Sequence, residues 1–125
     1  MLGWHITVFR QTNSGVEPAT FDSKTGPRIA VWQADYSGLN WFNELAKQDK
    51  ALDLGGAGYP TRFSAQAKHL MPTILAGPPS AREVWVSDAT DILTSQWVGR
   101  TLVDHDEAAN CGEEEWLLVV AWDES

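Results

Sequence analysis

"EEEWLLVVAW", Glu113–Trp122, begins with three acidic residues and is then apolar at every position. A strand with one solvated face needs apolar residues only at alternate positions, so a continuous apolar run predicts a strand covered on both faces. "RIAVWQA", Arg28–Ala34, is apolar on both faces apart from its ends and predicts a central strand. "WHITVFR", Trp4–Arg10, alternates and has one uniformly apolar face. These three stretches predict that a β-sheet forms the centre of the fold.

Two helical patterns lie between the second and the last of these strands. The first predicts a helix over Gly38–Ala51, with apolar residues at helical spacing and lysines near its end. The second begins at Ala67 and ends at Gly77, because a glycine followed by two prolines stops a helix. Pro72 predicts a kink or break inside it. A further strand is predicted over Arg82–Ser87, followed by a short helix.

The spacing from Asp104 to Glu107 resembles a capping box and predicts one or two further helical turns, with Gly112 as the terminator. This order of elements favours an α+β fold, a single small globular domain over residues 1–125. We expect a mixed or antiparallel sheet of about four to five strands, with two to four helices packed mainly on one face. The polar segment Gln11–Pro27 has no clear period and predicts a long loop or hairpin excursion, a kind of segment that often carries function.

The composition indicates a soluble globular protein. Hydrophobic residues make up 43% of the chain and charged residues 21%, and no apolar run approaches the roughly 20 residues of a membrane-spanning helix. The N-terminus lacks the features of a signal peptide. Cys111 is the single cysteine, so an internal disulfide is impossible and a cytoplasmic location is favoured.

The negative charge is concentrated in the last third of the chain. The net charge is −8, and it divides into +1 for residues 1–79 and −9 for residues 80–125. Such a surface repels nucleic acids and anionic lipids, and it speeds the encounter with a basic protein. The alternative interpretation is that the acidic residues only keep a tryptophan-rich domain soluble.

The chain holds seven tryptophans, several times the usual number for its length. Most are expected in the core, with one or two in a functional surface. Because several strands are apolar on both faces, a homodimer interface is an alternative explanation for them.

"LGGAGYPTRF", Leu54–Phe63, contains three glycines within four residues, but it matches neither a P-loop nor a dinucleotide fingerprint, since Thr61 stands where a closing glycine is needed. We predict a stiff turn that joins the first helix to the kinked one, with Pro60 as a rigid exit. Tyr59 and Arg62, with His69 nearby, are the candidates for binding a carboxylate or an acidic group of a partner.

Catalytic and metal-binding patterns are weak. "DHDE", Asp104–Glu107, places one histidine among three acids, but adjacent residues on a helix point in different directions and do not converge on a metal. The nearest histidine to Cys111 is six positions away, so a structural thiol is favoured over a nucleophile. We therefore predict no catalytic residue, no cofactor and no metal site.

The leading hypothesis is a small acidic cytoplasmic binding protein that docks a basic protein partner, as an inhibitor or immunity protein docks a cationic toxin. Glu113, Glu114 and Glu115 are its candidate contact residues. The alternative is a small-ligand-binding domain, or an enzyme of unrecognised type, that uses the glycine turn at Gly55–Gly58. The sequence favours the binding protein over the enzyme.

Overall fold

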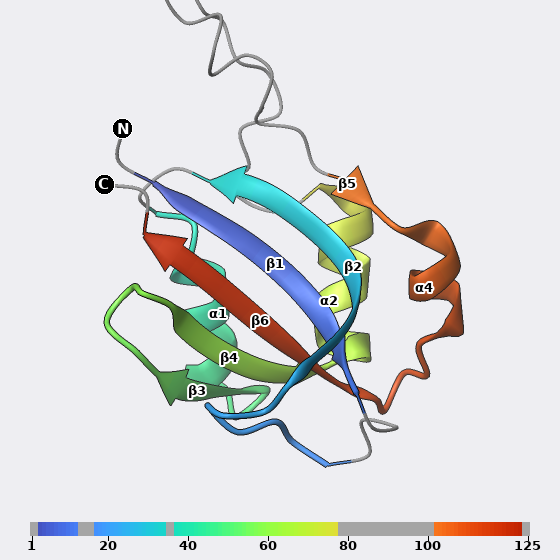
Figure 1. Cartoon of the computed structure of the whole chain (residues 1–125), viewed down its shortest axis with the longest axis horizontal. Coiled ribbons are helices and arrows are strands. Elements are labelled where there is room, and N and C mark those ends of the chain that lie inside the picture. The colour runs from blue at the N-terminus through green and yellow to red at the C-terminus, as the bar shows by residue number, and fades with distance from the viewer. Residues whose placement is uncertain (1–2, 13–16, 35–36, 78–101, 124–125) are drawn as a thin grey trace, which may run out of the picture.

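Figure 1 shows the computed structural model of the chain, which describes residues 3–12, 17–34, 37–77 and 102–123. In these ranges, six strands form one antiparallel sheet in the order β3-β4-β6-β1-β2-β5. The strands are β1 (Trp4–Gln11), β2 (Thr25–Ala34), β3 (Ala51–Gly55), β4 (Thr61–Gln66), β5 (Leu102–Val103) and β6 (Trp116–Asp123). The helices are α1 (Asn40–Lys47), α2 (Ala67–Ala76) and α4 (His105–Asn110). The α+β class is confirmed, and the sheet has more strands than the four to five predicted.

β6 lies between β4 and β1, and both of its faces are covered as its sequence predicts. Leu117, Val119 and Ala121 point into the main core, whereas Leu118 and Val120 belong to a second apolar cluster on the opposite face. The second cluster also holds Ala19, whose N–H donates to Ser64 Oγ at 3.0 Å; the remaining contacts come from Phe9 and Leu54. Part of the predicted long loop therefore packs on the sheet.

The main core lies between the sheet and the helices. Trp32 and Phe63 from the strands meet Phe42 of α1 in an aromatic cluster, with ring centroids 6.4 and 5.4 Å from that of Phe42. Leu70 and Ile74 of α2 are fully or almost fully buried in the same core, and α4 contributes partly buried side chains. All three described helices thus pack on one face of the sheet (Figure 1).

The segment between α1 and α2 differs from the prediction. α1 ends at Lys47 and not at Ala51, because Asp49 adopts a left-handed conformation with φ of 59° and the Lys50 N–H returns to the Leu45 carbonyl at 2.8 Å. Ala51 instead begins β3, and the glycine-rich stretch is the hairpin loop between β3 and β4.

This hairpin replaces the predicted turn between two helices. The buried residues of β4 are Phe63, Ser64 and Ala65, of which only Phe63 is large and apolar. The alternation of apolar and polar residues that predicts a strand is therefore weak here. The strand is recognisable only through its partner, since Phe63 lies opposite Val119 of β6. α2 begins at Ala67 and ends before Gly77 as predicted, with Pro72 inside it.

The predicted strand Arg82–Ser87 and the short helix after it lie outside the described residues. None of the helices within the described ranges is both long and apolar enough to cross a membrane.

Candidate functional site

α4 begins at a strong cap. The Asp104 carboxylate accepts hydrogen bonds from the backbone N–H groups of Asp106 at 3.1 Å and Glu107 at 3.0 Å. The Asp104 N–H donates to the Ile29 carbonyl at 2.7 Å, which ties the start of the helix to β2. The predicted short helix is confirmed, but Glu107 makes no return bond to the cap among the described residues. Its carboxylate contacts Arg10 instead.

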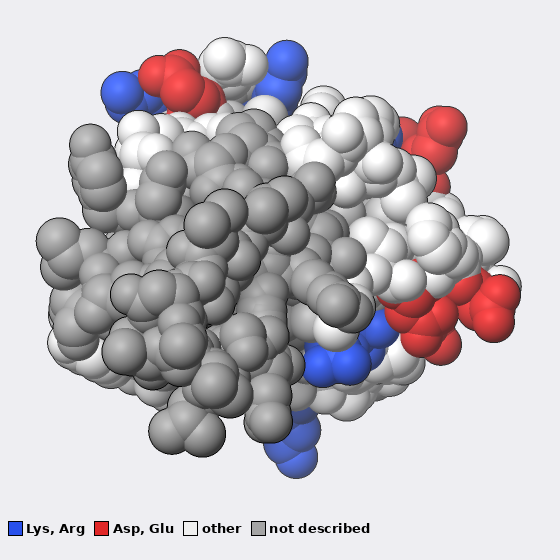
Figure 2. Space-filling model, turned by 90° about the horizontal axis from the view of Figure 1, so that it is seen from above, with Lys and Arg blue, Asp and Glu red and all other residues white. Residues whose placement is uncertain are grey.

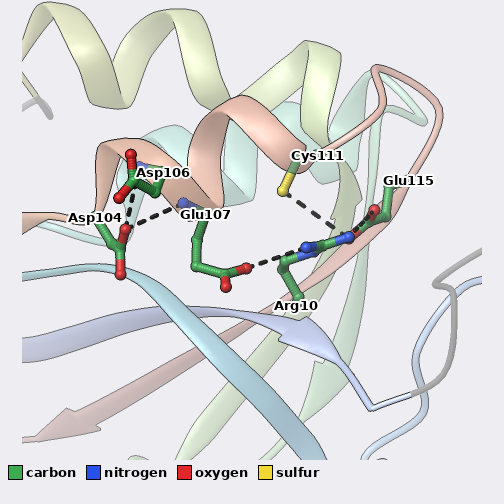
Figure 3. A network of polar contacts seen from close by, with 6 residues as sticks. All are labelled: Arg10, Asp104, Asp106, Glu107, Cys111 and Glu115. Carbon is green, nitrogen blue, oxygen red and sulfur yellow. Dashed lines mark hydrogen bonds and ion pairs between the residues drawn. The ribbon is translucent and has the colours of Figure 1, made fainter.

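Arg10 lies at the centre of a polar network beneath α4 (Figure 3). It follows Ile6 and Val8 at core-facing positions of β1, so its side chain projects toward the helices. Its Nε and Nη2 donate to the two carboxylate oxygens of Glu115 at 2.8 and 3.0 Å, and its Nη1 donates to Glu107 at 3.0 Å. Since the Glu115 side chain is only 9% exposed, this bidentate pair is partly shielded from water.

The Cys111 thiol lies beside the same network, with its sulfur 3.9 Å from a Glu115 oxygen. Burial raises the pKa of the Cys111 thiol to about 11, and the negative charge of Glu115 adds to the rise. The thiolate is therefore scarce at neutral pH, and a structural role fits this cysteine better than a nucleophilic one.

The three predicted contact glutamates occupy different environments. Glu115 is paired with Arg10, whereas Glu114 is exposed and accepts from Lys68 Nζ at 2.9 Å and Gln66 Nε2 at 2.8 Å. Lys68 holds the pKa of the Glu114 carboxyl below its usual value, with a smaller contribution from His69. Glu113 is exposed, and its carbonyl accepts the Lys68 N–H at 3.0 Å.

α4 and the turn before β6 together form an acidic surface, which we call the acidic corner. Its members are Asp104, Asp106, Glu107, Glu113, Glu114 and Glu115. Arg10 and Lys68 are the cations that pair with these acids in the described structure, so six carboxylates and two cations give a balance of −4. Seen from above, acidic side chains gather at the right-hand edge (Figure 2), the side on which α4 lies in Figure 1.

Tyr59 and Arg62 do not join this surface. Tyr59 lies in the β3–β4 loop and is 68% exposed. The loop holds a cis Tyr59–Pro60 peptide, and the Gly58 carbonyl accepts the Asp123 N–H at 2.8 Å. Arg62 lies near the opposite end of β4 from Gln66, the residue that contacts the acidic corner. His69 is half-buried on α2, next to Lys68.

Arg62 contacts the segment before β2. Its Nη1 donates to the Ser23 carbonyl at 3.2 Å, and its guanidinium carbon lies 5.3 Å from the centre of the Phe21 ring. Its Nε is buried and has no hydrogen-bond acceptor among the described residues. These residues line a hollow of about 420 Å³ together with Asp22, Lys24 and Thr25.

The sequence prediction missed Arg10 and Glu107 at the acidic corner and Phe21 and Lys24 at the hollow. Arg10 carried a detectable signal, because it is a charged residue in phase with the apolar face of a strand. Glu107 carried only the capping-box spacing from Asp104, and Phe21 and Lys24 carried no local signal. Within the described ranges, no three or more His, Cys, Asp or Glu side chains are placed to hold a metal ion.

No family model, curated protein or solved structure matches this chain.

Proposed function

We propose that the protein is a small acidic cytoplasmic binding protein that docks a basic protein partner through the acidic corner, in the manner of an inhibitor or immunity protein on a cationic toxin. The observation that carries the proposal is the balance of −4 over two short adjoining segments. Asp106 and Glu113 are exposed and form no ion pair within the described residues, so their charges are available to a partner.

The corner supports docking because the helix that carries part of its charge is held in place. α4 has six residues, none of them buried, and so short a helix is not stable alone. The Asp104 cap and the Arg10 pair with Glu107 hold it against the sheet. A backbone that is held in place is not reordered when an oppositely charged partner binds, which lowers the entropic cost of binding.

The test is a capture experiment with two charge-matched variants. The first carries Asp106→Asn and Glu113→Gln, which removes two free charges from the corner; the second carries Glu17→Gln and Glu44→Gln, which removes two exposed charges elsewhere. Glu114 and Glu115 are left intact, because they pair with Lys68 and Arg10 and their loss would confuse folding with binding.

We expect the wild type and the second variant to capture a basic protein at low salt. The first variant should not capture it, and the wild type should lose it at high salt. Equal capture by both variants would contradict docking at the acidic corner.

Self-association is a second proposal for the partner. β3 lies at one end of the described sheet, and Leu52 on it is 42% exposed. Exposed edge strands pair readily with other strands, including those of a second copy. Sedimentation velocity should then show a dimer that Leu52→Lys converts to a monomer, and a monomeric wild type at high concentration would eliminate this proposal.

A further inference from the structure

The hollow beside β4 is separate from the acidic corner. Arg62 alternates in β4 with the core residue Phe63, so it projects from the sheet face opposite the helices. The segment 21–25 borders the hollow on the other side. Its volume of about 420 Å³ is within the range of small-molecule sites in proteins.

The hollow is positive in a protein that is strongly negative. Its lining includes the cations Lys24 and Arg62 and one carboxylate, Asp22, which gives a local balance of +1 against −8 for the whole chain. Neither cation forms an ion pair with a carboxylate of the described residues. A small anion would therefore meet two cations that have no ion-pair partner, and it would be repelled by the carboxylate of Asp22.

The Arg62 guanidinium is held in place and has unused donors. Phe21 lies beside it and the Ser23 carbonyl accepts from Nη1, so the group has little freedom left to lose on binding. Its Nε donor is buried without an acceptor among the described residues, and a buried donor without a partner is costly. Nη2 forms no hydrogen bond within the described residues, so it is the donor that a carboxylate or phosphate oxygen can reach.

We propose that this hollow binds a small molecule through an oxyanion, either a carboxylate or a phosphate group. The oxyanion accepts a hydrogen bond from Arg62 Nη2, and Lys24 Nζ supplies the second positive charge. The polar remainder of the hollow, which includes Thr25, favours a hydrophilic ligand. This function goes beyond partner docking and depends on none of the residues of the acidic corner.

The probes are citrate and inorganic phosphate, titrated separately into ¹⁵N-labelled full-length protein at constant ionic strength. We expect saturable backbone shifts at residues 21–25 and at Arg62. Saturation by citrate alone identifies a carboxylate ligand, and saturation by phosphate alone identifies a phosphate ligand. The absence of saturable shifts in this segment with both probes would overturn the proposal.

Matched variants test the assignment of the residues. Lys24→Gln and Arg62→Gln should each weaken binding by about tenfold, the loss expected for one charge-assisted hydrogen bond. Lys50→Gln removes an exposed positive charge outside the hollow and should leave the affinity unchanged. Asp22→Asn should tighten binding, because it removes the opposing carboxylate. If the single variants Lys24→Gln and Asp22→Asn both bound with the affinity of the wild type, the proposal would be overturned. This outcome can be read even if Arg62→Gln fails to fold.

Discussion

Arg10 holds together three parts of the chain at the acidic corner. Its guanidinium joins β1 to α4 through Glu107 and to the turn before β6 through Glu115. Its side chain is 24% exposed, so solvent screens the pair with Glu115 less than it would on an open surface. Its hydrogen bonds to Glu115 and Glu107 raise the pKa of Arg10 above its already high ordinary value, so the guanidinium is charged at neutral pH.

Arg10→Met should destabilise the protein by about 2 kcal/mol, because it leaves the shielded Glu115 carboxylate without its donors. Urea denaturation monitored by tryptophan fluorescence measures the change. Lys68→Met is the matched control, since it breaks the exposed pair with Glu114 and should cost much less than Arg10→Met. Equal losses in the two variants would contradict the structural role of Arg10.

Cys111 should react slowly with iodoacetamide at pH 8 in the native protein. The reactive species is the thiolate, and a pKa of about 11 keeps the thiol protonated at that pH. The rate should rise as the pH approaches 11, and protein unfolded in urea should react at the rate of an ordinary cysteine. Mass spectrometry of timed samples measures both rates. Native protein that is alkylated as fast as the unfolded protein would show that burial does not protect this thiol.

The ion pairs at the acidic corner could not be predicted from local patterns. Arg10 is separated by 97 residues from Glu107 and by 105 from Glu115. The pairing of β1 with β6 brings Glu115 close, and the bond that ties the start of α4 to β2 brings Glu107 close. Glu114 and Glu115 are adjacent and identical in type, yet one lies in solvent and the other is nearly buried. The direction of each side chain depends on the turn that connects to β6, which composition does not encode.

At the scale of elements, the β3–β4 hairpin depends on glycine at a single position more than at its neighbours. Gly56 has φ of +109°, and a Cβ there would overlap the carbonyl oxygen of Pro60. Gly55 has a similar φ of +93°, but a Cβ there would meet no atom within 4 Å. Alanine at Gly55 would add only backbone strain, whereas alanine at Gly56 would add strain and a steric overlap.

Gly56→Ala should lower the free energy of unfolding by about 2 to 4 kcal/mol, because strain and overlap add. Gly55→Ala should cost about 1 to 2 kcal/mol from strain alone. Thermal or urea unfolding of both variants provides the comparison. A Gly55→Ala loss as large as that of Gly56→Ala would contradict the close approach of Pro60 to Gly56.

The elements that the sequence predicts well are those with a strong apolar period or a clear stop signal. β1, β2 and β6 were predicted from runs such as Leu117–Ala121, and α2 from its stop at Gly77. The hairpin of β3 and β4 was missed because two of the buried residues of β4, Ser64 and Ala65, are small and give little hydrophobic signal. They are buried because β4 pairs with the apolar strand β6. β5 has two residues, too few for any period.

At the scale of the whole molecule, the described residues separate two kinds of charge. The acidic corner lies at α4 and the turn before β6, and the positive hollow lies at β4 and the segment before β2. The concentration of acidic residues in the last third of the chain was evident from the sequence. The positive hollow was not, because Lys24 and Arg62 come together only through the fold. On the two proposals above, a protein of net charge −8 attracts a basic partner at one site and a small anion at another.

Docking through the acidic corner is tested by the salt dependence of binding to the captured basic protein. Isothermal titration calorimetry over a series of salt concentrations should give an affinity that falls steeply with salt, because the Debye length shrinks from about 10 Å at 0.1 M to about 3 Å at 1 M. The variant with Asp106→Asn and Glu113→Gln should bind more weakly and with a shallower dependence, while the variant with Glu17→Gln and Glu44→Gln should follow the wild type. An affinity that is independent of salt, or the same slope in all three proteins, would contradict docking through the acidic corner.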